Sequence, residues 1–125
     1  MKVKAFLLSI LAVFFPIKAA LITVFVLIAA DLIFGLMAAK KRGEPITSSG
    51  FRRTLTKFLV YEVAVMLAFL AQQYLTGEMI PVEQITAAYI GLVEIKSVME
   101  NLNDISGGSI LKSLLDKLNS ENLQK

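Results

Sequence analysis

The side chains of this chain that could do chemistry are a few charged groups set in apolar sequence. Asp31 lies within a long apolar run, and a later stretch carries polar residues at three- and four-residue spacing, which places them on one helix face. These are Glu94, Ser97, Glu100, Asn101 and Asp104. Paired carboxylates suit acid–base chemistry, but the chain has no His, no Cys and no Gly-rich phosphate loop. We therefore expect no enzyme, no metal site and no cofactor.

Asp31 is the most informative of these groups. It lies nine residues before Lys40, a distance of about 13 Å along a helix, and a charge at that depth in lipid faces a partner or water. One interpretation is that Asp31 lines a pore or becomes exposed when helices rearrange. The other is that it is protonated or hydrogen-bonded inside a helix bundle, with Lys57 or Thr54 as its partner.

The element that carries Asp31 runs from Ala19 to Ala39, 21 residues with one charge. A helix of that length reaches about 30 Å, the thickness of a bilayer's hydrocarbon core. Its 11 Leu, Ile, Val and Phe residues favour insertion by about 3 to 7 kcal/mol, which offsets roughly 3 kcal/mol for one carboxylate. With 56% hydrophobic residues and a mean hydropathy of +0.69, the chain belongs to the membrane class.

The remaining apolar stretches complete the expected fold. Further spans are predicted at about 55–75 and, with a more polar face, at about 82–99. The segment 5–15 is too short to span alone, so we expect it either to continue through Pro16 as a kinked helix or to lie in the interface. Because no small-x-small cleavage site follows it, we expect it to be retained. The prediction is an all-α integral membrane protein with about three transmembrane helices, 5–15 providing a fourth or an interfacial helix.

The last residues have a different character from the membrane domain predicted for 1–105. After Ser106-Gly107-Gly108, leucines recur with helical spacing opposite Lys112, Asp116 and Lys117. We predict a short amphipathic helix in a cytoplasmic tail, 106–125, with Ser109 as its N-cap.

Basic residues set the predicted topology. Six of them lie between positions 40 and 57, whereas 76–81 has none. They are Lys40, Lys41, Arg42, Arg52, Arg53 and Lys57. The positive-inside rule places this loop, and with it the C-terminus, in the cytoplasm. We interpret the cluster as topology and lipid-headgroup contacts; a dedicated cytoplasmic partner is the alternative. It is too short and too poor in aromatics for nucleic-acid binding.

Small residues mark the faces on which helices can pack closely in lipid. Asp31, Gly35 and Ala39 share one face, and Ala64 and Ala68 repeat the four-residue spacing in the second span. Such faces can meet within one chain or between copies of it, and both arrangements stay open.

Taken in order, these residues resemble the phage lysis holin family, which includes toxin-secretion holins. The matching residues are Asp31, Gly35, Ala38, Ala39, Lys40, Thr47, Ser48, Ser49, Gly50, Lys57, Glu94, Ser97, Glu100 and Asn101. Order and spacing hold from about residue 25 to 118. The family usually continues to a Gly-x-Pro-x-Pro turn, where this chain has Ser106-Gly107-Gly108-Ser109.

The resemblance implies a homo-oligomer in the lipid of a bacterial cytoplasmic membrane. It would open lesions through which an endolysin, or in related systems a toxin, leaves the cell, without necessarily touching that cargo. Polar groups would stay buried between helices until they meet water in a lumen. The chief alternative is a membrane anchor or assembly subunit of a phage or secretion complex. A small channel or transporter subunit is less favoured because no inverted repeat is visible.

Overall fold

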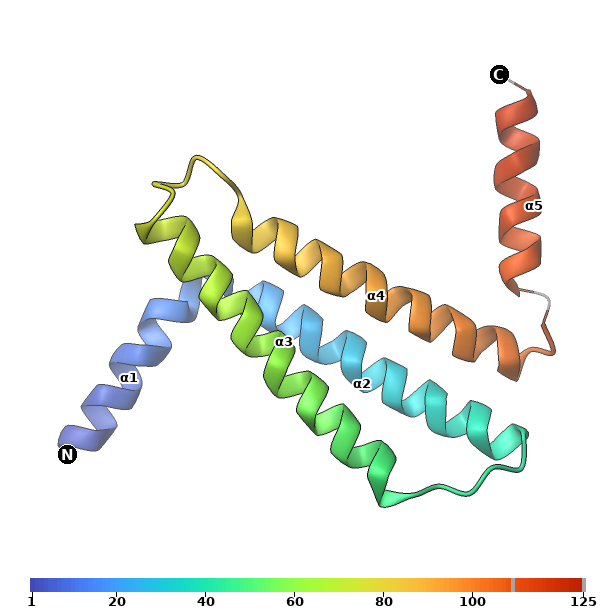
Figure 1. The fold of residues 1–125 in the computed structure, drawn as a ribbon, viewed down its shortest axis with the longest axis horizontal. Coiled ribbons are helices and arrows are strands. Elements are labelled where there is room, and N and C mark those ends of the chain that lie inside the picture. The colour runs from blue at the N-terminus through green and yellow to red at the C-terminus, as the bar shows by residue number, and fades with distance from the viewer. Residues whose placement is uncertain (109, 125) are drawn as a thin grey trace.

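The helices of this protein follow its apolar stretches. The computed structural model describes residues 1–108 and 110–124, with the side chains of residues 110 and 111 left out. Every regular element in this part of the chain is a helix, which confirms the all-helical class. The elements are α1 (Lys2–Phe14), the short 3-10 helix η1 (Phe15–Ile17), α2 (Lys18–Lys41), α3 (Ser48–Tyr74), α4 (Val82–Ile105) and α5 (Ile110–Leu123) (Figure 1).

Two helical stretches are long and apolar enough to cross a membrane. They are Lys2–Lys41, which runs through α1, η1 and α2, and Ser48–Tyr74, which is α3. These stretches correspond to the spans expected at about 19–39 and 55–75. The third expected span, 82–99, forms the greater part of α4, which has the same length as α2, 24 residues. Because α4 carries five charged residues, its composition does not qualify it as a candidate membrane span.

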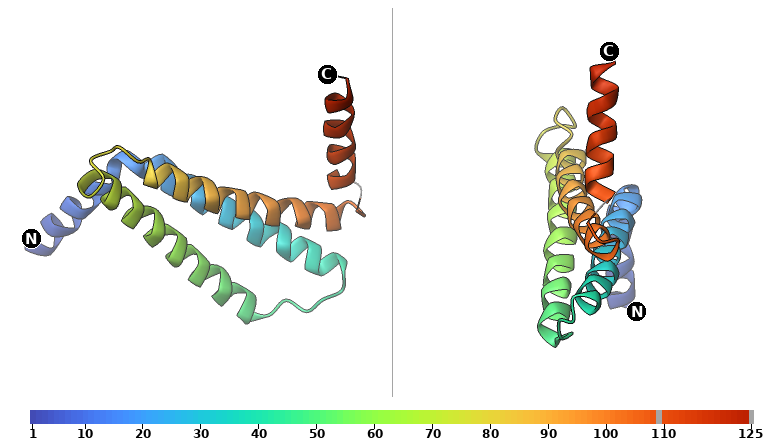
Figure 2. Two further views of the ribbon diagram at one scale, coloured as in Figure 1. Left: turned by 45° about the horizontal axis from the view of Figure 1, so that its top comes forward. Right: turned by 90° about the vertical axis from the view of Figure 1, so that its right-hand side faces the viewer.

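Helices α2, α3 and α4 lie side by side and form a bundle (Figure 1). Its apolar core joins Val24 and Ile28 of α2, Val65 and Phe69 of α3, and Ile90 of α4. All five lie in the half of the bundle remote from the α2–α3 connection. Towards that connection α3 diverges from the other two helices (Figure 2). The ion pairs that join the three helices, described below, lie on the connection side of this apolar core.

Helix α1 points away from the bundle (Figures 1 and 2). The chain bends at η1, where Pro16 lacks the backbone N–H that a continuous helix requires. The end of α1 contacts the bundle, where the rings of Phe14 and Phe69 lie 6.3 Å apart. The bend at Pro16 therefore agrees with the kinked arrangement among the alternatives for 5–15.

The outer surface of the bundle is largely apolar. Large hydrophobic side chains such as Phe25, Leu59 and Leu92 are each more than half exposed, a pattern that suits lipid better than water. Hydroxyl groups on the helices return to their own backbone: Thr23 donates to the carbonyl of Ala19 at 2.7 Å. Such bonds satisfy a hydroxyl where lipid offers no partner.

Helix α5 is separate from the bundle and points in a different direction (Figures 1 and 2). The chain turns at Gly107 and Gly108, whose φ values of 85° and 92° lie in the left-handed region that favours glycine. Leu114, Leu115 and Leu118 are exposed along α5. The proposed N-cap, Ser109, lies outside the described residues, as do the side chains of residues 110 and 111.

Candidate functional site

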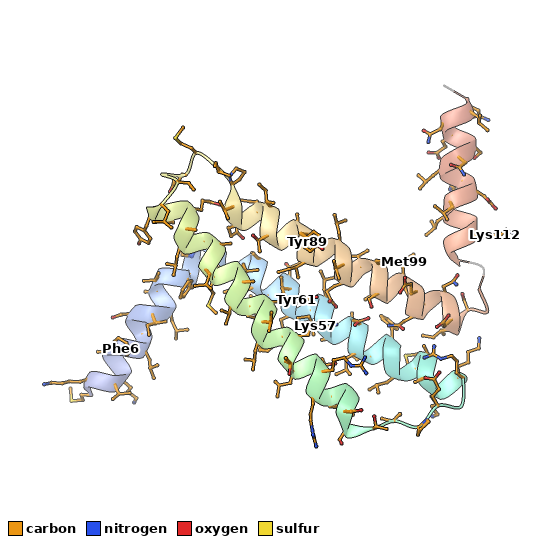
Figure 3. The ribbon with its side chains drawn as sticks, viewed as in Figure 1. Phe6, Lys57, Tyr61, Tyr89, Met99 and Lys112 are labelled. Carbon is orange, nitrogen blue, oxygen red and sulfur yellow. The ribbon has the colours of Figure 1, made fainter. Side chains whose placement is uncertain are left out.

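Three helices each bring polar groups to one point inside the bundle. Helix α2 contributes Asp31, α3 contributes Lys57, and α4 contributes Glu94 and, two turns later, Asn101. The hydrogen bonds among them join residues that are 26, 37 and 70 positions apart in the sequence. We call these four residues the polar network. Lys57 and its neighbour Tyr61 lie where α3 passes α2 (Figure 3).

Lys57 is the centre of the polar network. Its Nζ lies 2.8 Å from Oδ2 of Asp31 and 3.0 Å from Oε2 of Glu94, so one ammonium group donates to two carboxylates. The other carboxylate oxygen of Asp31 accepts a hydrogen bond from Nδ2 of Asn101 at 3.0 Å. Thr54, the alternative partner for Asp31, donates to the carbonyl of Gly50 instead, at 3.1 Å.

Burial gives these contacts their energetic weight. The side chain of Glu94 is 1% exposed, that of Asp31 15% and that of Lys57 24%. Removing a charge from water costs several kcal/mol per ion, and only close pairing with further hydrogen bonds offsets that cost. Two carboxylates and one ammonium carry a formal charge of −1. Lys57 therefore keeps two like charges together within the bundle.

Close approach of α2 and α4 depends on the small residues beside Asp31. A Cβ atom at Gly35 would lie 3.4 Å from Nδ2 of Asn101, an ordinary contact, so a small residue here leaves space for this amide to reach Asp31. One turn on, Ala38 is completely buried and Ala39 is half-buried. The face of α2 that holds Asp31, Gly35 and Ala39 thus lies against Asn101 of α4 or beside the cavity described below.

The basic end of α2 is joined to the end of α4. Nζ of Lys41 donates to the backbone carbonyl of Ile105, and Nη1 of Arg42 lies 2.6 Å from Oδ2 of Asp104. Arg42 also pairs with Glu44 at 2.8 Å. The hydrogen bond from Arg42, and then its charge, lower the pKa of the exposed Glu44 carboxyl below its ordinary value. These contacts fix α2 and α4 to end on the same side of the bundle.

The other residues singled out in the sequence lie outside the polar network. Ala68 is buried in the bundle, and Ala64 is half-buried beside the apolar core. Ser97 lines the cavity, whereas Glu100 is exposed and pairs with Lys96 at 3.6 Å. Among the basic residues, Lys40, Arg52 and Arg53 are all exposed.

Two further polar features, one a contact and one an unpaired atom, were not expected from the sequence. At the far end of the bundle the backbone N–H of Glu83 donates to Oε1 of Gln72 at 3.0 Å, which ties the start of α4 to the end of α3. Glu62, on α3, has a buried Oε1 atom without a hydrogen-bond partner among the described residues. A carboxylate within an apolar span is a signal for Glu62, but Gln72 and Glu83 look like ordinary helix-end residues.

A cavity of about 480 Å³ opens beside the polar network. Asp31, Lys57 and Asn101 line its end nearest the core, and Arg42 and Arg53 line it nearer the α2–α3 connection. The cavity exists because α3 diverges from α2 towards this connection (Figure 2). Sequence composition does not report such a divergence.

The polar network pairs charged side chains inside the bundle. The ammonium of Lys57 is already shared by two carboxylates, so it is not a free base or nucleophile. Within residues 1–108 and 110–124, no three His, Cys, Asp or Glu side chains gather as metal ligands. The arrangement can hold the three helices together. If the helices separate, it exposes charged groups.

A comparison with protein families gives one result. The model of a family described as the bacteriophage holin family matches residues 9–121, most of the chain. No curated protein and no solved structure is significantly similar to the chain.

Proposed function

The chain belongs to the bacteriophage holin family, and we propose that it assembles in the bacterial cytoplasmic membrane and opens lesions that release an endolysin. Membrane association and a holin-type role in phage lysis follow from the family. Oligomerisation, the lesion and the released cargo are the parts proposed here. The observation that supports them is the polar network between α2, α3 and α4, enclosed by an apolar outer surface.

The network supports a protein with two states. In the closed state each charge of the polar network has a partner inside one bundle, so these groups do not meet lipid unpaired. If the helices separate, the ion pairs of Lys57 with Asp31 and Glu94 break, and the three charged groups require hydration by water. A water-filled lumen provides that water. The charged groups are satisfied by one another in the closed bundle and by water in a lumen, but not by lipid. This property suits an abrupt change between the two states.

Helix α4 supplies a second reason for a lumen or a subunit contact. Its Lys96–Glu100 pair lies on the outer surface, with side chains 80% and 57% exposed. Lys96 is near the middle of α4, a depth at which exposed charge is costly in lipid. We propose that α4 crosses the membrane as a third span and turns this edge towards other subunits or water.

The proposed topology follows from the same contacts. The basic residues between positions 40 and 57 favour the cytoplasmic side. Because Lys41 and Arg42 contact the end of α4, that end and α5 lie on the same side as the basic loop. The connection after Tyr74 then lies outside.

Induced expression in bacteria tests the proposal. We expect the membrane potential to collapse abruptly after a lag, and a co-expressed endolysin to reach the cell wall from that moment. The readouts are a potential-sensitive dye and release of a cytoplasmic enzyme. Steady growth with intact potential at high expression would instead favour the alternative role of a membrane anchor, with α5 as its docking element.

A further inference from the structure

The cavity between α2 and α3 contains more positive charge than the polar network uses. Three cationic side chains line it: Arg42, Arg53 and Lys57. Arg42 pairs with Glu44 and Asp104, and Lys57 with two carboxylates. Arg53 lines the same cavity but has no ion pair in the described part of the chain. The cavity therefore presents one uncommitted guanidinium group.

We propose that this cavity binds an anionic phospholipid, with the lipid phosphate on Arg53. A guanidinium group donates two parallel hydrogen bonds to phosphate oxygens, which makes arginine well suited to this ligand. Arg53 precedes Lys57 by four residues, about 6 Å along α3 towards the basic loop. That position places the guanidinium near the level of lipid headgroups, while the Lys57 ammonium lies deeper.

The apolar part of the wall distinguishes a lipid from a soluble anion. Leu32 and Leu36 of α2 line the cavity, as do Ile46 in the connection and Phe51 in the first turn of α3. Ile46 and Phe51 are 55% and 48% exposed. A free phosphate ion gains nothing from such surfaces, whereas acyl chains gain contact with them. The chemistry shared by both ligands is the phosphate, and the apolar wall favours the lipid.

The chain offers a matched control in the neighbouring residue. Arg52 has the same charge and also lies in the first turns of α3, but it does not line the cavity. General attraction to an anionic membrane surface treats the two arginines alike. Binding in the cavity, by contrast, depends on Arg53 and not on Arg52.

Native mass spectrometry of the full chain in detergent, titrated with phosphatidylglycerol, tests the site. We expect Arg53→Gln to weaken binding of the first lipid about fivefold and Arg52→Gln to leave it unchanged. Phosphatidylcholine should bind more weakly than phosphatidylglycerol to the unmodified chain. Equal losses in the two variants, or equal binding of the two lipids, would overturn the proposal.

Two further arms separate the ligand sources and check the fold. Millimolar inorganic phosphate should not displace phosphatidylglycerol; displacement, with no preference for the lipid, would assign the cavity to a soluble anion. Arg53→Lys keeps the charge and should bind better than Arg53→Gln, with unchanged helix content by circular dichroism. Complete loss in Arg53→Lys would contradict the site. Because no lysis is measured, this result is independent of lesion formation.

Discussion

Nζ of Lys57 lies 2.8 Å from Oδ2 of Asp31, although the two residues belong to different helices and are 26 positions apart. The same nitrogen reaches Glu94 of a third helix. A bundle whose apolar core fills only one half thus has an ionic contact that joins all three helices in the other half. In lipid the hydrophobic effect does not hold helices together, so packing and polar contacts of this kind carry more of the stability.

The first prediction concerns Lys57 itself. Lys57→Met removes the partner of two buried carboxylates and should lower the free energy of unfolding by about 3 kcal/mol, the lower end of the range for a broken buried pair because Lys57 is partly exposed. Unfolding in detergent by titrated dodecyl sulfate, followed by circular dichroism, measures the change.

Lys96→Met is the matched control, because Lys96 lies on α4 in an exposed pair with Glu100. Exposed pairs of this type contribute little, so its unfolding curve should stay close to that of the unmodified chain. Adding Asp31→Asn and Glu94→Gln to Lys57→Met should restore part of the loss. A control variant as unstable as Lys57→Met would refute the special role of the network.

A second prediction links the network to the timing of lysis. Asp31→Leu removes one ion pair and the shorter of the two hydrogen bonds that Asn101 donates to this residue, which leaves the amide with the backbone carbonyl at 3.4 Å. We expect an earlier collapse of membrane potential, because the closed bundle is held less firmly. Asp31→Asn keeps a hydrogen-bonding side chain and should shift the onset less. If Asp31→Leu leaves the onset unchanged at an equal amount of protein in the membrane, the polar network does not control the timing of lysis.

Gly35 provides a third prediction, about helix approach. A Cβ at this position would lie 3.4 Å from Asn101, an ordinary contact, so Gly35→Ala should be tolerated. Gly35→Leu extends the side chain into the amide and should separate α2 from α4, with a loss of about 1 to 3 kcal/mol from overpacking. The same unfolding titration reports it.

Gly91 of α4 is the control for that series. A Cβ there would lie 3.9 Å from the flexible end of Leu27, so Gly91→Ala should also be tolerated. If Gly35→Leu unfolds no more readily than Gly35→Ala, the contact between Gly35 and Asn101 does not limit helix approach.

The sequence predicts much of this fold for a clear physical reason. A run of 21 residues with one charge has few alternatives to a membrane helix, and the bend at Pro16 follows from a missing backbone donor. Helix α3 begins at Ser48, earlier than the expected span at 55, and these additional turns are largely polar and partly line the cavity. Composition detects the apolar part of a helix and not its polar ends.

The sequence predicts less of the site. Asp31 stands out because a lone carboxylate in an apolar run needs a partner, and Lys57 and Thr54 are the two alternatives that the sequence offers for it. That Lys57 also reaches Glu94 depends on the register between α3 and α4, which neither composition nor spacing determines. The cavity depends on the divergence of α3 from α2, a property of packing over many residues.

The last prediction tests the topology on which the proposed function depends. A reporter inserted at Gly43, in the α2–α3 connection, should report the cytoplasm, and one at Gly77, after α3, should report the exterior. The motive is the difference in basic residues, six between positions 40 and 57 and none between 76 and 81. Both glycines have positive φ values, 74° and 58°, in turns with open space around them, so an insertion there disturbs little packing.

A third reporter after Lys117 decides whether α4 crosses the membrane. Since Lys41 and Arg42 contact the end of α4, this position should report the same side as Gly43. Asp104→Asn removes one of these contacts and leaves the basic loop intact, so it should not change any of the three signals. A cytoplasmic signal at Gly77 would mean that α3 does not cross, and the three-span arrangement would then be wrong.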